Sequence, residues 1–338
     1  MRGIVLTRFG DPAEVLELQT LPDPPPPGPG EVVVRVTKRL VHPGNLAMIR
    51  GRFGLQLPAG GLVLGADGVG IVEAVGDGLD SAAGVKPGAR VIFSPTRGAW
   101  AERLKTRADL VTAIPDDLPD SIAAQLLPNT VISLLLLRAA QRVAPDAGRQ
   151  TPILLTAAGS SVARILTIAA RRRGLKVVGA VRSAKGAKIL SARFADLTVV
   201  STADPTWVDQ VRRAAGERPL QVIVDPVGGT MVSDLVGLLG DGGALLFYGG
   251  LDPQPITLPS IRLAHHEIMF KGVSSGRWLQ TTSAEQRRAD VAEAIEIGRT
   301  APEQFEVAAD YGLDRFADAI GNSERTGRNG AVLISSDS

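Results

Sequence analysis

The amino-acid sequence contains no cysteine, and only 4% of its 338 residues are aromatic. The absence of cysteine excludes disulfide bonds, a thiolate nucleophile and every zinc site that depends on cysteine ligands. Positive and negative side chains nearly cancel, because 37 lysines and arginines stand against 35 aspartates and glutamates, for a net charge of +2. So small an excess gives no reason to expect a nucleic-acid partner.

No uninterrupted apolar run of the sequence is long enough to span a membrane. The longest, VISLLLL at 131–137, is far shorter than the ~20 residues that a bilayer requires. The first residues, MRGIVLTRFGDP, have neither a long apolar core nor a small-residue cleavage site, so they do not resemble a signal peptide. The basic cluster Arg171–Arg173 fits cations at the end of a helix. We expect a soluble cytoplasmic protein without a membrane partner.

The sequence changes character near residue 126, which predicts two kinds of domain. Before that point, GEVVVRVTK (30–38) and GVGIVEAVGDG (68–78) have the composition of strands between turns. The segment PDPPPPGPG (22–30) cannot enter a sheet interior and indicates a stiff surface loop. A chain of 338 residues is long enough for two domains.

After residue 126, apolar runs of strand length alternate with helical segments. Such alternation predicts right-handed crossovers and a parallel sheet that is covered on both faces. Residues 284–300 indicate a helix, and GAVLISS near the C-terminal end indicates one more strand. The predicted strands of the parallel sheet are ILLTA (153–157), KVVGAV (176–181), LTVVS (197–201), QVIVDPV (221–227) and GALLFYGG (243–250).

The segment LLTAAGSSVARILTIAARRRG (154–174) has the form of a nucleotide-binding strand, turn and helix. Such a turn places helix N-terminal amides, with their partial positive charge, against a pyrophosphate. Nucleotide-binding turns usually have three glycines, and here only Gly159 is present. Ala163 is small enough for close packing, and two serines occupy the positions between them. Any junction of a strand and a helix favours small residues, so the turn alone is weak evidence. The candidate cofactor-binding residues of the turn are Gly159, Ser160, Ser161 and Val162.

The end of the next predicted strand indicates which nucleotide binds. A site for NAD carries an acidic residue there for the ribose hydroxyls, whereas KVVGAV ends in Arg182 and Ser183, with Lys185 just beyond. A guanidinium and a hydroxyl suit a 2′-phosphate, and the missing acid also argues against S-adenosylmethionine. The alternative is two solvated cations in a loop. We predict NADPH. The glycine-ended strands VDPVGG (224–229) and LLFYGG (245–250) reach the same sheet edge and add Tyr248, Gly249 and Gly250 to the candidate residues.

Taken together, these motifs resemble the zinc-independent medium-chain dehydrogenase/reductases. That branch contains the quinone oxidoreductases and the mitochondrial-type 2-enoyl thioester reductases. The resemblance covers nearly the whole chain, and the order and spacing of the motifs make it specific. The motifs that carry it are RGIVLTRFGDPAEVLEL, PGPGEVVVRV, VHPGNLAMIRGRFG, LGADGVGIVEAVG, AAGSSVA and VDPVGG.

The resemblance implies an α/β protein with two domains. A GroES-like β-barrel catalytic domain would be formed by both ends of the chain, and a Rossmann domain with a doubly wound parallel sheet would be inserted between them. We place the barrel at 1–125 and 267–338 and the NADPH-binding Rossmann domain at 126–266. The resemblance also implies a homodimer formed through the edges of the Rossmann sheets, here through residues 255–273.

The resemblance further bears on the need for a metal. Zinc-dependent relatives have a cysteine ligand after the third strand, a His-Glu pair further on and a lobe with four cysteines. This chain has VHPGN at 41–45 and Gly65-Ala66-Asp67 at the corresponding places. Two of its three histidines, His265 and His266, fall in the predicted dimer edge. We therefore predict catalysis without a metal.

Reduction of an activated C=C without a metal needs a hydride from nicotinamide, a proton, and a group that polarises the substrate carbonyl. In the enoyl-reductase-like relatives the loop written here as IRGRFG carries a tyrosine for this purpose, and this chain has Phe53 instead. Phenylalanine cannot donate a proton. His42 and Asn45 stand in a motif that usually has Asn first and Asp last, and either can donate a hydrogen bond near the nicotinamide. A structural role of His42 as a turn residue before Pro43 fits equally well.

Further residues correspond to the family's cleft. Thr130, in LPNTVISLL, matches a threonine near the nicotinamide half of the cofactor, and with Asn129 it is also a candidate helix N-cap. Ser274 and Ser275 stand where relatives often have bulky aromatic residues, which predicts a wider or more polar pocket. Phe53 and Trp278 are the candidate residues that line it.

The leading hypothesis is an NADPH-dependent reductase of quinones, enones or enals that acts without a metal. One alternative is a 2-enoyl thioester reductase, which Phe53 disfavours. The other is a cofactor-binding protein with little catalytic activity, which the missing tyrosine and the altered glycines leave open.

Overall fold

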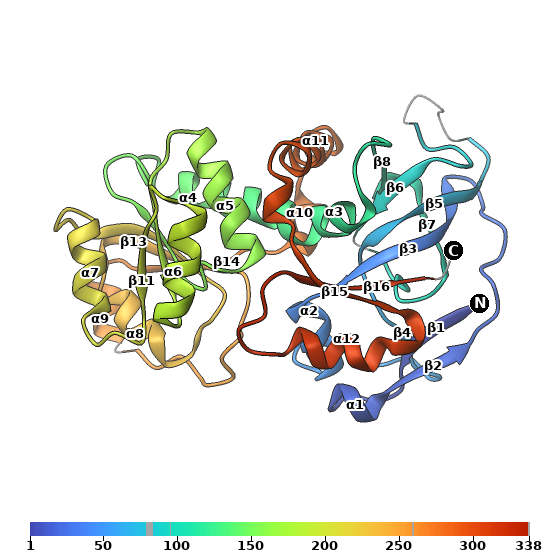
Figure 1. Cartoon of the computed structure of the whole chain (residues 1–338), viewed down its shortest axis with the longest axis horizontal. Coiled ribbons are helices and arrows are strands. Elements are labelled where there is room, and N and C mark those ends of the chain that lie inside the picture. Colours follow the sequence, from blue (N-terminus) through green and yellow to red (C-terminus); the bar gives the residue numbers. More distant parts are fainter. Residues whose placement is uncertain (79–83, 95, 259, 337–338) are drawn as a thin grey trace. The chain divides into compact units, whose positions relative to one another are not determined.

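The computed structural model describes residues 1–78, 84–94, 96–258 and 260–336. The chain divides into two compact units, whose elements are labelled in Figure 1. The first unit consists of Met1–Val131 and Thr282–Ser338, and the second of Ile132–Thr281. The second unit extends beyond residue 266, where the sequence placed its end, because strand β14 (Met269–Gly272) joins its sheet.

The second unit is built around a six-stranded parallel sheet with the order β11-β10-β9-β12-β13-β14. From β9 the chain adds β10 and β11 on one side, and it then returns to add β12, β13 and β14 on the other. The order therefore reverses between β9 and β12, which is where doubly wound sheets form a ligand crevice at the carboxyl ends of their strands. The other strands are β9 (Ile153–Leu155), β10 (Val177–Val181), β11 (Thr198–Ser201), β12 (Leu220–Asp225) and β13 (Leu239–Phe247).

Helices cover this sheet, and their apolar sides form its core. Buried Trp207 and Val211 of α7 and Leu235 of α8 pack with Leu154 and Ile223 of the central strands. Helices α4 and α5 pack against each other. Burial of this kind supplies most of the free energy that holds such helices. The helices are α4 (Ile132–Val143), α5 (Ser161–Arg172), α6 (Ala184–Arg193), α7 (Trp207–Ala214), α8 (Val232–Val236), α9 (Ser260–His265) and α10 (Ser275–Thr281).

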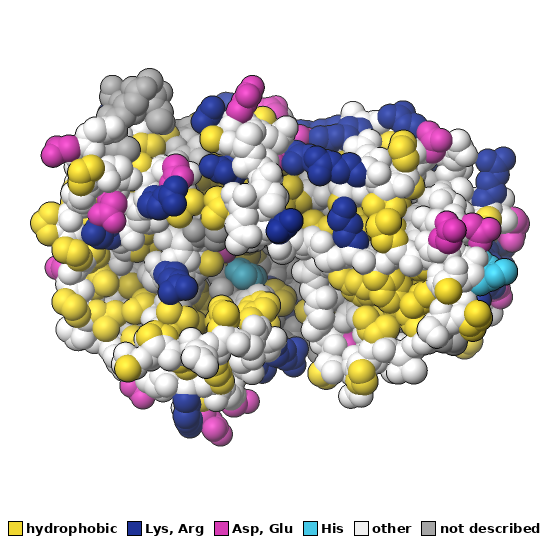
Figure 2. Space-filling view, turned by 180° about the vertical axis from the view of Figure 1, so that it is seen from behind, with side chains coloured by type: hydrophobic (Ala, Val, Ile, Leu, Met, Phe, Trp, Pro, Cys, Tyr) yellow, Lys and Arg dark blue, Asp and Glu magenta, His cyan; other side chains and the backbone are white. Residues whose placement is uncertain are grey.

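The sheet ends in an apolar surface at β14. Hydrophobic side chains gather on the surface of the second unit that Figure 2 shows. Among the exposed hydrophobic residues of this unit, Met269 and Phe270 of β14 are 46% and 38% exposed, and Ile256 and Ile261 are exposed as well. We call these four residues the edge patch. An edge strand with exposed apolar side chains is a site at which another chain can bind.

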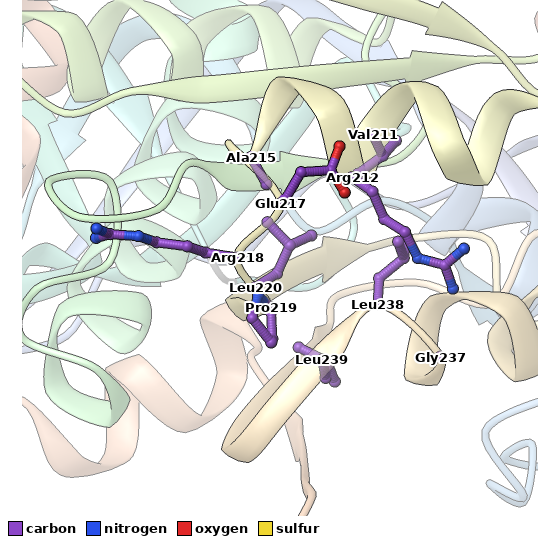
Figure 3. Close-up of a pocket in the computed structure, with 10 residues that line it drawn as sticks. All are labelled: Val211, Arg212, Ala215, Glu217, Arg218, Pro219, Leu220, Gly237, Leu238 and Leu239. Carbon is purple, nitrogen blue, oxygen red and sulfur yellow. The ribbon is translucent and has the colours of Figure 1, made fainter.

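A small hollow of about 130 Å³ lies at the amino ends of the strands of the second unit (Figure 3). Its lining includes Leu220 and Leu239, the first residues of β12 and β13. The guanidinium of Arg218 points away from the other residues drawn in Figure 3. Because it opens at the amino ends, this hollow is distinct from the crevice expected at the carboxyl ends.

Among the described residues the first unit has two sheets, and in the larger one a strand from near the C-terminal end pairs with strand β3 of the N-terminal part. Strand β3 (Glu31–Val41) pairs with β5 (Gly68–Val75), with β7 (Arg103–Arg107) and with β16 (Ala331–Ser335) from the C-terminal end. This pairing explains why residues 282–338 belong to the same unit as the N-terminal strands. The remaining strands are β1 (Arg2–Leu6), β2 (Leu16–Thr20), β4 (Leu62–Val63), β6 (Arg90–Phe93), β8 (Val111–Ala113) and β15 (Val307–Gly312).

A fully buried arginine links several segments of the first unit. Arg39, on β3, donates hydrogen bonds to the carbonyl oxygens of Ala99 (2.9 Å), Ala101 (2.6 Å) and Ile334 (3.4 Å). Burial lowers the pKa of Arg39 to about 9. These hydrogen bonds offset part of the cost of removing the guanidinium from water.

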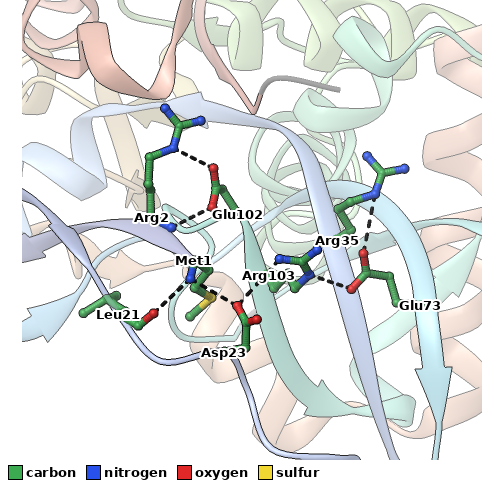
Figure 4. A network of polar contacts seen from close by, with 8 residues as sticks. All are labelled: Met1, Arg2, Leu21, Asp23, Arg35, Glu73, Glu102 and Arg103. Carbon is green, nitrogen blue, oxygen red and sulfur yellow. Dashed lines mark hydrogen bonds and ion pairs between the residues drawn. The ribbon is translucent and has the colours of Figure 1, made fainter.

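Polar contacts at the surface hold the N-terminal strand (Figure 4). The Met1 ammonium lies 3.1 Å from the Asp23 carboxylate and donates to the Leu21 carbonyl oxygen (2.9 Å). The Arg2 guanidinium donates to Glu102 at 2.7 Å. Ion pairs near the surface contribute about 0–1 kcal/mol each, so these contacts add little to the stability of the strand.

One long apolar helix begins in the first unit and continues into α4 of the second. Helix α3 continues through a π-helical turn, Leu126–Val131, into α4. The combined helix Asp120–Val143 is long and apolar enough to cross a membrane, but 83% of its most apolar stretch is buried inside the protein, as in a core helix. The α-helices of the first unit are α1 (Pro12–Val15), α2 (Pro43–Ile49), α3 (Asp120–Gln125), α11 (Ala284–Thr300) and α12 (Phe316–Ser323).

Candidate functional site

The turn between β9 and α5 leads into the capped N-terminus of a helix. Ser160 is the N-cap of α5, and its hydroxyl oxygen accepts a hydrogen bond from the Ala163 amide at 3.3 Å. Ser161 and Val162 form the first positions of the helix, so their amides belong to its free N-terminal end. Such amides attract an anion.

The left-handed residue of this turn is Ala157, not Gly159. Ala157 has a φ of 45°, a conformation that glycine adopts with less strain. Gly159 is not in the left-handed region, and a Cβ at that position would meet nothing within 4 Å. The sequence analysis took Gly159 to be the glycine that the turn needs. In the structure the left-handed backbone conformation falls at Ala157, two positions earlier, and the sequence alone did not indicate this.

A buried carboxylate supports the turn from the neighbouring strand. Asp225, at the end of β12, accepts hydrogen bonds from the Thr156 hydroxyl and from the Gly228 amide (2.7 Å). Burial raises the pKa of Asp225 above its ordinary value of 3.8, and hydrogen bonds from Thr156, Gly228 and Val227 oppose that rise. Sequence reasoning missed both Thr156 and Asp225, because the contact joins positions far apart in the chain.

The end of β13 meets the same turn. The pKa of Tyr248 is raised mainly by burial, and a hydrogen bond to the Ser160 side chain acts in the opposite direction. The Tyr248 phenol therefore lies at the start of α5. Gly249 allows close packing, because a Cβ there would lie 2.9 Å from the Pro226 carbonyl oxygen, whereas Gly250 faces open space.

Two exposed cations follow β10. Ser183 caps α6, since its hydroxyl oxygen accepts a hydrogen bond from the Gly186 amide at 3.2 Å. Arg182 and Lys185, on either side of this cap, are exposed, and neither forms an ion pair with any residue that the structure describes. No acidic residue occupies this strand end.

One further polar group stands at the end of the neighbouring strand, β11. In the register of β10 and β11, Ser201 pairs with Val181, the residue before Arg182. The Ser201 hydroxyl is buried and has no hydrogen-bond partner within the described residues. A buried hydroxyl without a partner costs free energy, which a bound anion would recover. Sequence reasoning missed Ser201, because only the strand register brings it to this place.

In the first unit, His42 and Asn45 form a reciprocal cap at the start of α2. The His42 Nδ1 atom accepts a hydrogen bond from the Gly44 amide at 3.1 Å. The Asn45 Oδ1 atom accepts one from the His42 amide at 3.0 Å. On the other side of the ring, His42 Nε2 lies 3.4 Å from a carboxylate oxygen of buried Asp67, an electrostatic contact that is not aligned as a hydrogen bond. Both ring nitrogens of His42 therefore face polar groups of the fold, which favours the structural role of this residue.

The other predicted residues of the catalytic region differ in burial. The Phe53 side chain is 56% exposed on the loop after α2. Thr130 is fully buried inside the π-helical turn, so the expectation that it caps a helix is wrong. Its hydroxyl has no hydrogen-bond partner among the described residues. Turns of π-helix are frequent at functional sites.

In the second unit, Trp278 is buried in α10. The Ser274 hydroxyl accepts a hydrogen bond from the Arg277 amide at 3.2 Å, so Ser274 begins this helix. Within the described residues no group of three or more His, Asp or Glu side chains could hold a metal ion. His265 and His266 lie at α9, where His266 faces Asp241 at 2.7 Å.

The fold combines a unit built from both ends of the chain with an inserted doubly wound parallel sheet, and the matches to known families follow this division. Residues 28–116 match the alcohol dehydrogenase GroES-like domain family, and residues 162–296 match the zinc-binding dehydrogenase family. These matches agree with the GroES-like unit and the inserted Rossmann sheet that the sequence predicted.

Individual relatives agree with this assignment. The chain is 30% identical to the mitochondrial enoyl-[acyl-carrier-protein] reductase of Bos taurus over 293 residues, which cover 85% of this chain and 75% of that protein. It is 29% identical to the quinone oxidoreductase of Rattus norvegicus over 251 residues, or 74% of this chain and 73% of that protein. A mycobacterial protein solved in complex with NADPH superposes with a TM-score of 0.86 at 26% identity, over 99% of this chain and 100% of that one.

The chain belongs to the medium-chain dehydrogenase/reductase family, whose members bind a nicotinamide cofactor.

Proposed function

We propose that the protein is an NADPH-dependent reductase of activated C=C and C=O compounds, namely quinones, enones and enals, and that it acts without a metal. The observation that carries the cofactor assignment is the end of β10, where Arg182 and Lys185 are exposed without ion-pair partners in the described structure and where no acidic residue stands. The unpartnered hydroxyl of Ser201 at the adjacent strand end adds a donor for a 2′-phosphate.

The cofactor would bind along the carboxyl ends of the sheet. The amides of Ser161 and Val162 and the hydroxyl of Ser160 would hold the pyrophosphate, while Arg182 and Lys185 would hold the 2′-phosphate. Thr130 stays a candidate for the nicotinamide half of the cofactor only because the family resemblance implies it. When bound, the nicotinamide supplies a hydride. The protein supplies binding, orientation and the polarisation of the substrate.

Phe53 favours quinones and reactive enones as substrates over 2-enoyl thioesters. Reduction of a 2-enoyl thioester needs a proton or hydrogen-bond donor, which phenylalanine lacks. The two-electron reduction of a quinone gives a stabilised anion that water can protonate. The similarity to enoyl-[acyl-carrier-protein] reductases keeps the thioester reductase as the second candidate. A binding protein with little turnover is the third.

A turnover assay distinguishes the three candidates. Purified protein would be given NADPH together with a small quinone, a cyclic enone, an enal or a 2-enoyl thioester, before and after exhaustive chelation. We expect kcat/KM to be highest for a quinone or enone, and we expect chelation to leave it unchanged. If a 2-enoyl thioester is reduced faster than every quinone and enone, the protein is a thioester reductase. If it binds NADPH tightly but reduces none of these compounds, it is a binding protein with little turnover. Stoichiometric zinc in the purified protein would contradict the metal-independent reaction.

We further propose that two copies of the chain associate through residues 255–273. The edge patch supports this proposal, since it places exposed apolar side chains on β14, the last strand of the sheet. A second copy that covers this edge would remove those side chains from water.

A further inference from the structure

The end of strand β12 contains a buried carboxylate that the proposed reduction does not use. Asp225 is fully buried, and no lysine, arginine or histidine forms an ion pair with it within the described residues. A carboxylate that leaves water without a counter-ion costs free energy, and hydrogen bonds return only part of it. Stability alone therefore does not explain an aspartate here. Residues that break the rules of stable packing are typical of functional sites.

The Asp225 carboxylate joins the two segments that follow the central strands of the sheet. One is the nucleotide turn, residues 156–160 after β9, whose Thr156 hydroxyl donates to Asp225. The other is residues 226–229 after β12, which we call the glycine loop, and its Gly228 amide donates to Asp225 at 2.7 Å. The strand order reverses between β9 and β12, so these segments flank the crevice in which a doubly wound sheet binds its ligand. Asp225 therefore connects the two sides of that crevice.

The nucleotide turn needs support because its backbone is strained. Ala157 has a φ of 45°, a conformation that persists in an L-residue only where the surrounding contacts enforce it. Both of its neighbours are fixed, since the Thr156 amide donates to the backbone of β12 and the Ala158 amide to that of β10, each at 3.0 Å. The hydrogen bond from the Thr156 hydroxyl to Asp225 adds a side-chain contact to this set. Loss of that hydroxyl would release one of the contacts that hold the strained residue.

The glycine loop is fixed to its surroundings as well. Gly228 is in the left-handed region, with a φ of 74°, and this sharp bend directs its amide to Asp225. The Val227 carbonyl oxygen accepts from the Asp252 amide at 2.9 Å, and the Asp225 carbonyl oxygen accepts from the Tyr248 amide at 3.3 Å. These bonds attach the loop to the segment after β13. Asp225 thus lies where the ends of β9, β12 and β13 are joined.

Given the proposed NADPH site, we propose that Asp225 is a positioning residue for the dinucleotide. Its carboxylate holds the nucleotide turn against the glycine loop, so that the amides of Ser161 and Val162 are placed to bind the pyrophosphate. Because its side chain is fully buried, Asp225 acts through Thr156 and Gly228 and not by contact with the cofactor. NADPH and NADH share the pyrophosphate, so this role affects both cofactors equally.

The substitution Thr156→Val tests this role, because it removes the hydroxyl with little change in side-chain shape. We expect the dissociation constants for NADPH and NADH, measured by fluorescence titration, to rise by about tenfold each, so that their ratio stays that of the wild type. Thr156→Ser keeps the hydroxyl and should bind both within about threefold of the wild type. Thr167→Val is the matched control and should leave both constants unchanged. Thr167 is as buried as Thr156, at 2% against 1%, but its hydroxyl donates to the Ala163 carbonyl oxygen inside α5.

A double-mutant cycle shows whether the hydroxyl acts through the carboxylate. Asp225→Leu removes both contacts and should raise the two dissociation constants at least as much as Thr156→Val does. In the Asp225→Leu background, Thr156→Val should then have no further effect, because its partner is already gone. Additive effects of the two substitutions would contradict the proposed role of Asp225. If Asp225→Leu does not fold, the comparison of Thr156→Val with Thr156→Ser and Thr167→Val still decides.

Hydrogen exchange tests the positioning without a cofactor. In Thr156→Val, peptides that cover residues 156–163 and 226–230 should exchange their amide hydrogens at least about threefold faster than in the wild type, while β10 is unchanged. Unchanged exchange in both segments, or unchanged dissociation constants in Thr156→Val, would overturn the proposed role. If the wild type binds neither dinucleotide, the proposed function fails, and the exchange rates still decide whether the contact with Asp225 fixes these two segments.

Discussion

At the scale of single residues, the nucleotide turn contains an alanine in a conformation that costs free energy. The left-handed φ of 45° at Ala157 costs an L-residue about 1–2 kcal/mol. Glycine would avoid this cost but would lose about 0.5–1 kcal/mol of conformational entropy on folding. The difference between the two terms favours glycine.

We therefore predict that Ala157→Gly stabilises the protein by about 0.5–1 kcal/mol, measured as the free energy of unfolding in urea. Gly159→Ala is the matched control. Its backbone is not left-handed and a Cβ there meets nothing within 4 Å, so we expect no loss of stability. Destabilisation by Ala157→Gly would show that the alanine methyl contributes more through packing than it costs through strain.

The buried carboxylate of Asp225 gives a prediction about pH. Its folded pKa is raised, so the folded state binds more protons than the unfolded state at pH values just above 3.8. Stability from this group is therefore present at low pH and is lost as pH rises through the folded pKa. An asparagine in place of Asp225 would not titrate. Its single side-chain oxygen could accept from the Gly228 amide, while its NH2 group would face the Thr156 hydroxyl, which can accept a hydrogen bond.

We compare the free energies of unfolding of Asp225→Asn and wild type. We predict that the value for the variant minus that for the wild type increases as the pH is raised from about 4, because only the wild type loses stability as Asp225 ionises. Urea unfolding of both proteins across a series of pH values measures the difference, and the other carboxylates cancel in the comparison. A difference that does not change with pH would mean that Asp225 has an ordinary pKa.

At the same scale, the sequence could indicate residue types but not their contacts. The position of Arg182, Ser183 and Lys185 just after a strand was predictable, because the apolar run before them is clear, while their role toward a cofactor stays a prediction. The reciprocal cap of His42 and Asn45 was not predictable, since histidine and asparagine are unusual residues for that motif. In the sequence, Asp67 was noted only because it stands where zinc-dependent relatives have a different residue. Its contact with His42 joins segments that are far apart in the sequence, so it could not be predicted.

At the scale of secondary structure, periodicity predicted the parallel sheet well. The runs at 176–181 and 197–201 correspond to β10 and β11, and the predicted helix at 284–300 matches α11 (Ala284–Thr300). These elements have clear apolar patterns and turn residues at both ends, so local sequence defines them.

The elements that the sequence did not predict lack such patterns. Strand β4 has only two residues, Leu62 and Val63, and gains its pairing from β1. The π-helical turn at Leu126–Val131 lies inside a helix, where no local signal distinguishes it from α-helix. Strand β14 was expected to be part of a dimer edge, and its place in the sheet follows from pairing with β13.

At the scale of the whole molecule, the proposed dimer depends on the edge patch. We predict that the wild type sediments with twice the 35.3 kDa mass of one chain and that Phe270→Lys shifts it to the monomer, since a buried charge in the interface would have no partner. Val307→Lys is the control, because Val307 is an exposed apolar residue of β15 in the other unit. A monomeric wild type at micromolar concentration would contradict the proposal.

The central claim for the whole molecule is that it uses NADPH, and this claim rests on the cations after β10. One charge-assisted hydrogen bond contributes about 1.5–3 kcal/mol, which corresponds to at least a tenfold difference in affinity. The contacts to the pyrophosphate are common to both cofactors. Loss of Arg182 should therefore weaken NADPH binding and leave NADH binding nearly unchanged.

The most direct measurement is the pair of dissociation constants for NADPH and NADH, determined by fluorescence titration of the wild type, of Arg182→Ala and of Arg218→Ala. Arg218 is an exposed arginine near the amino end of β12, away from the turn, and serves as the control. We predict that the wild type and Arg218→Ala bind NADPH at least about tenfold tighter than NADH, and that Arg182→Ala loses most of this preference. Equal constants for the two cofactors in the wild type would contradict the account.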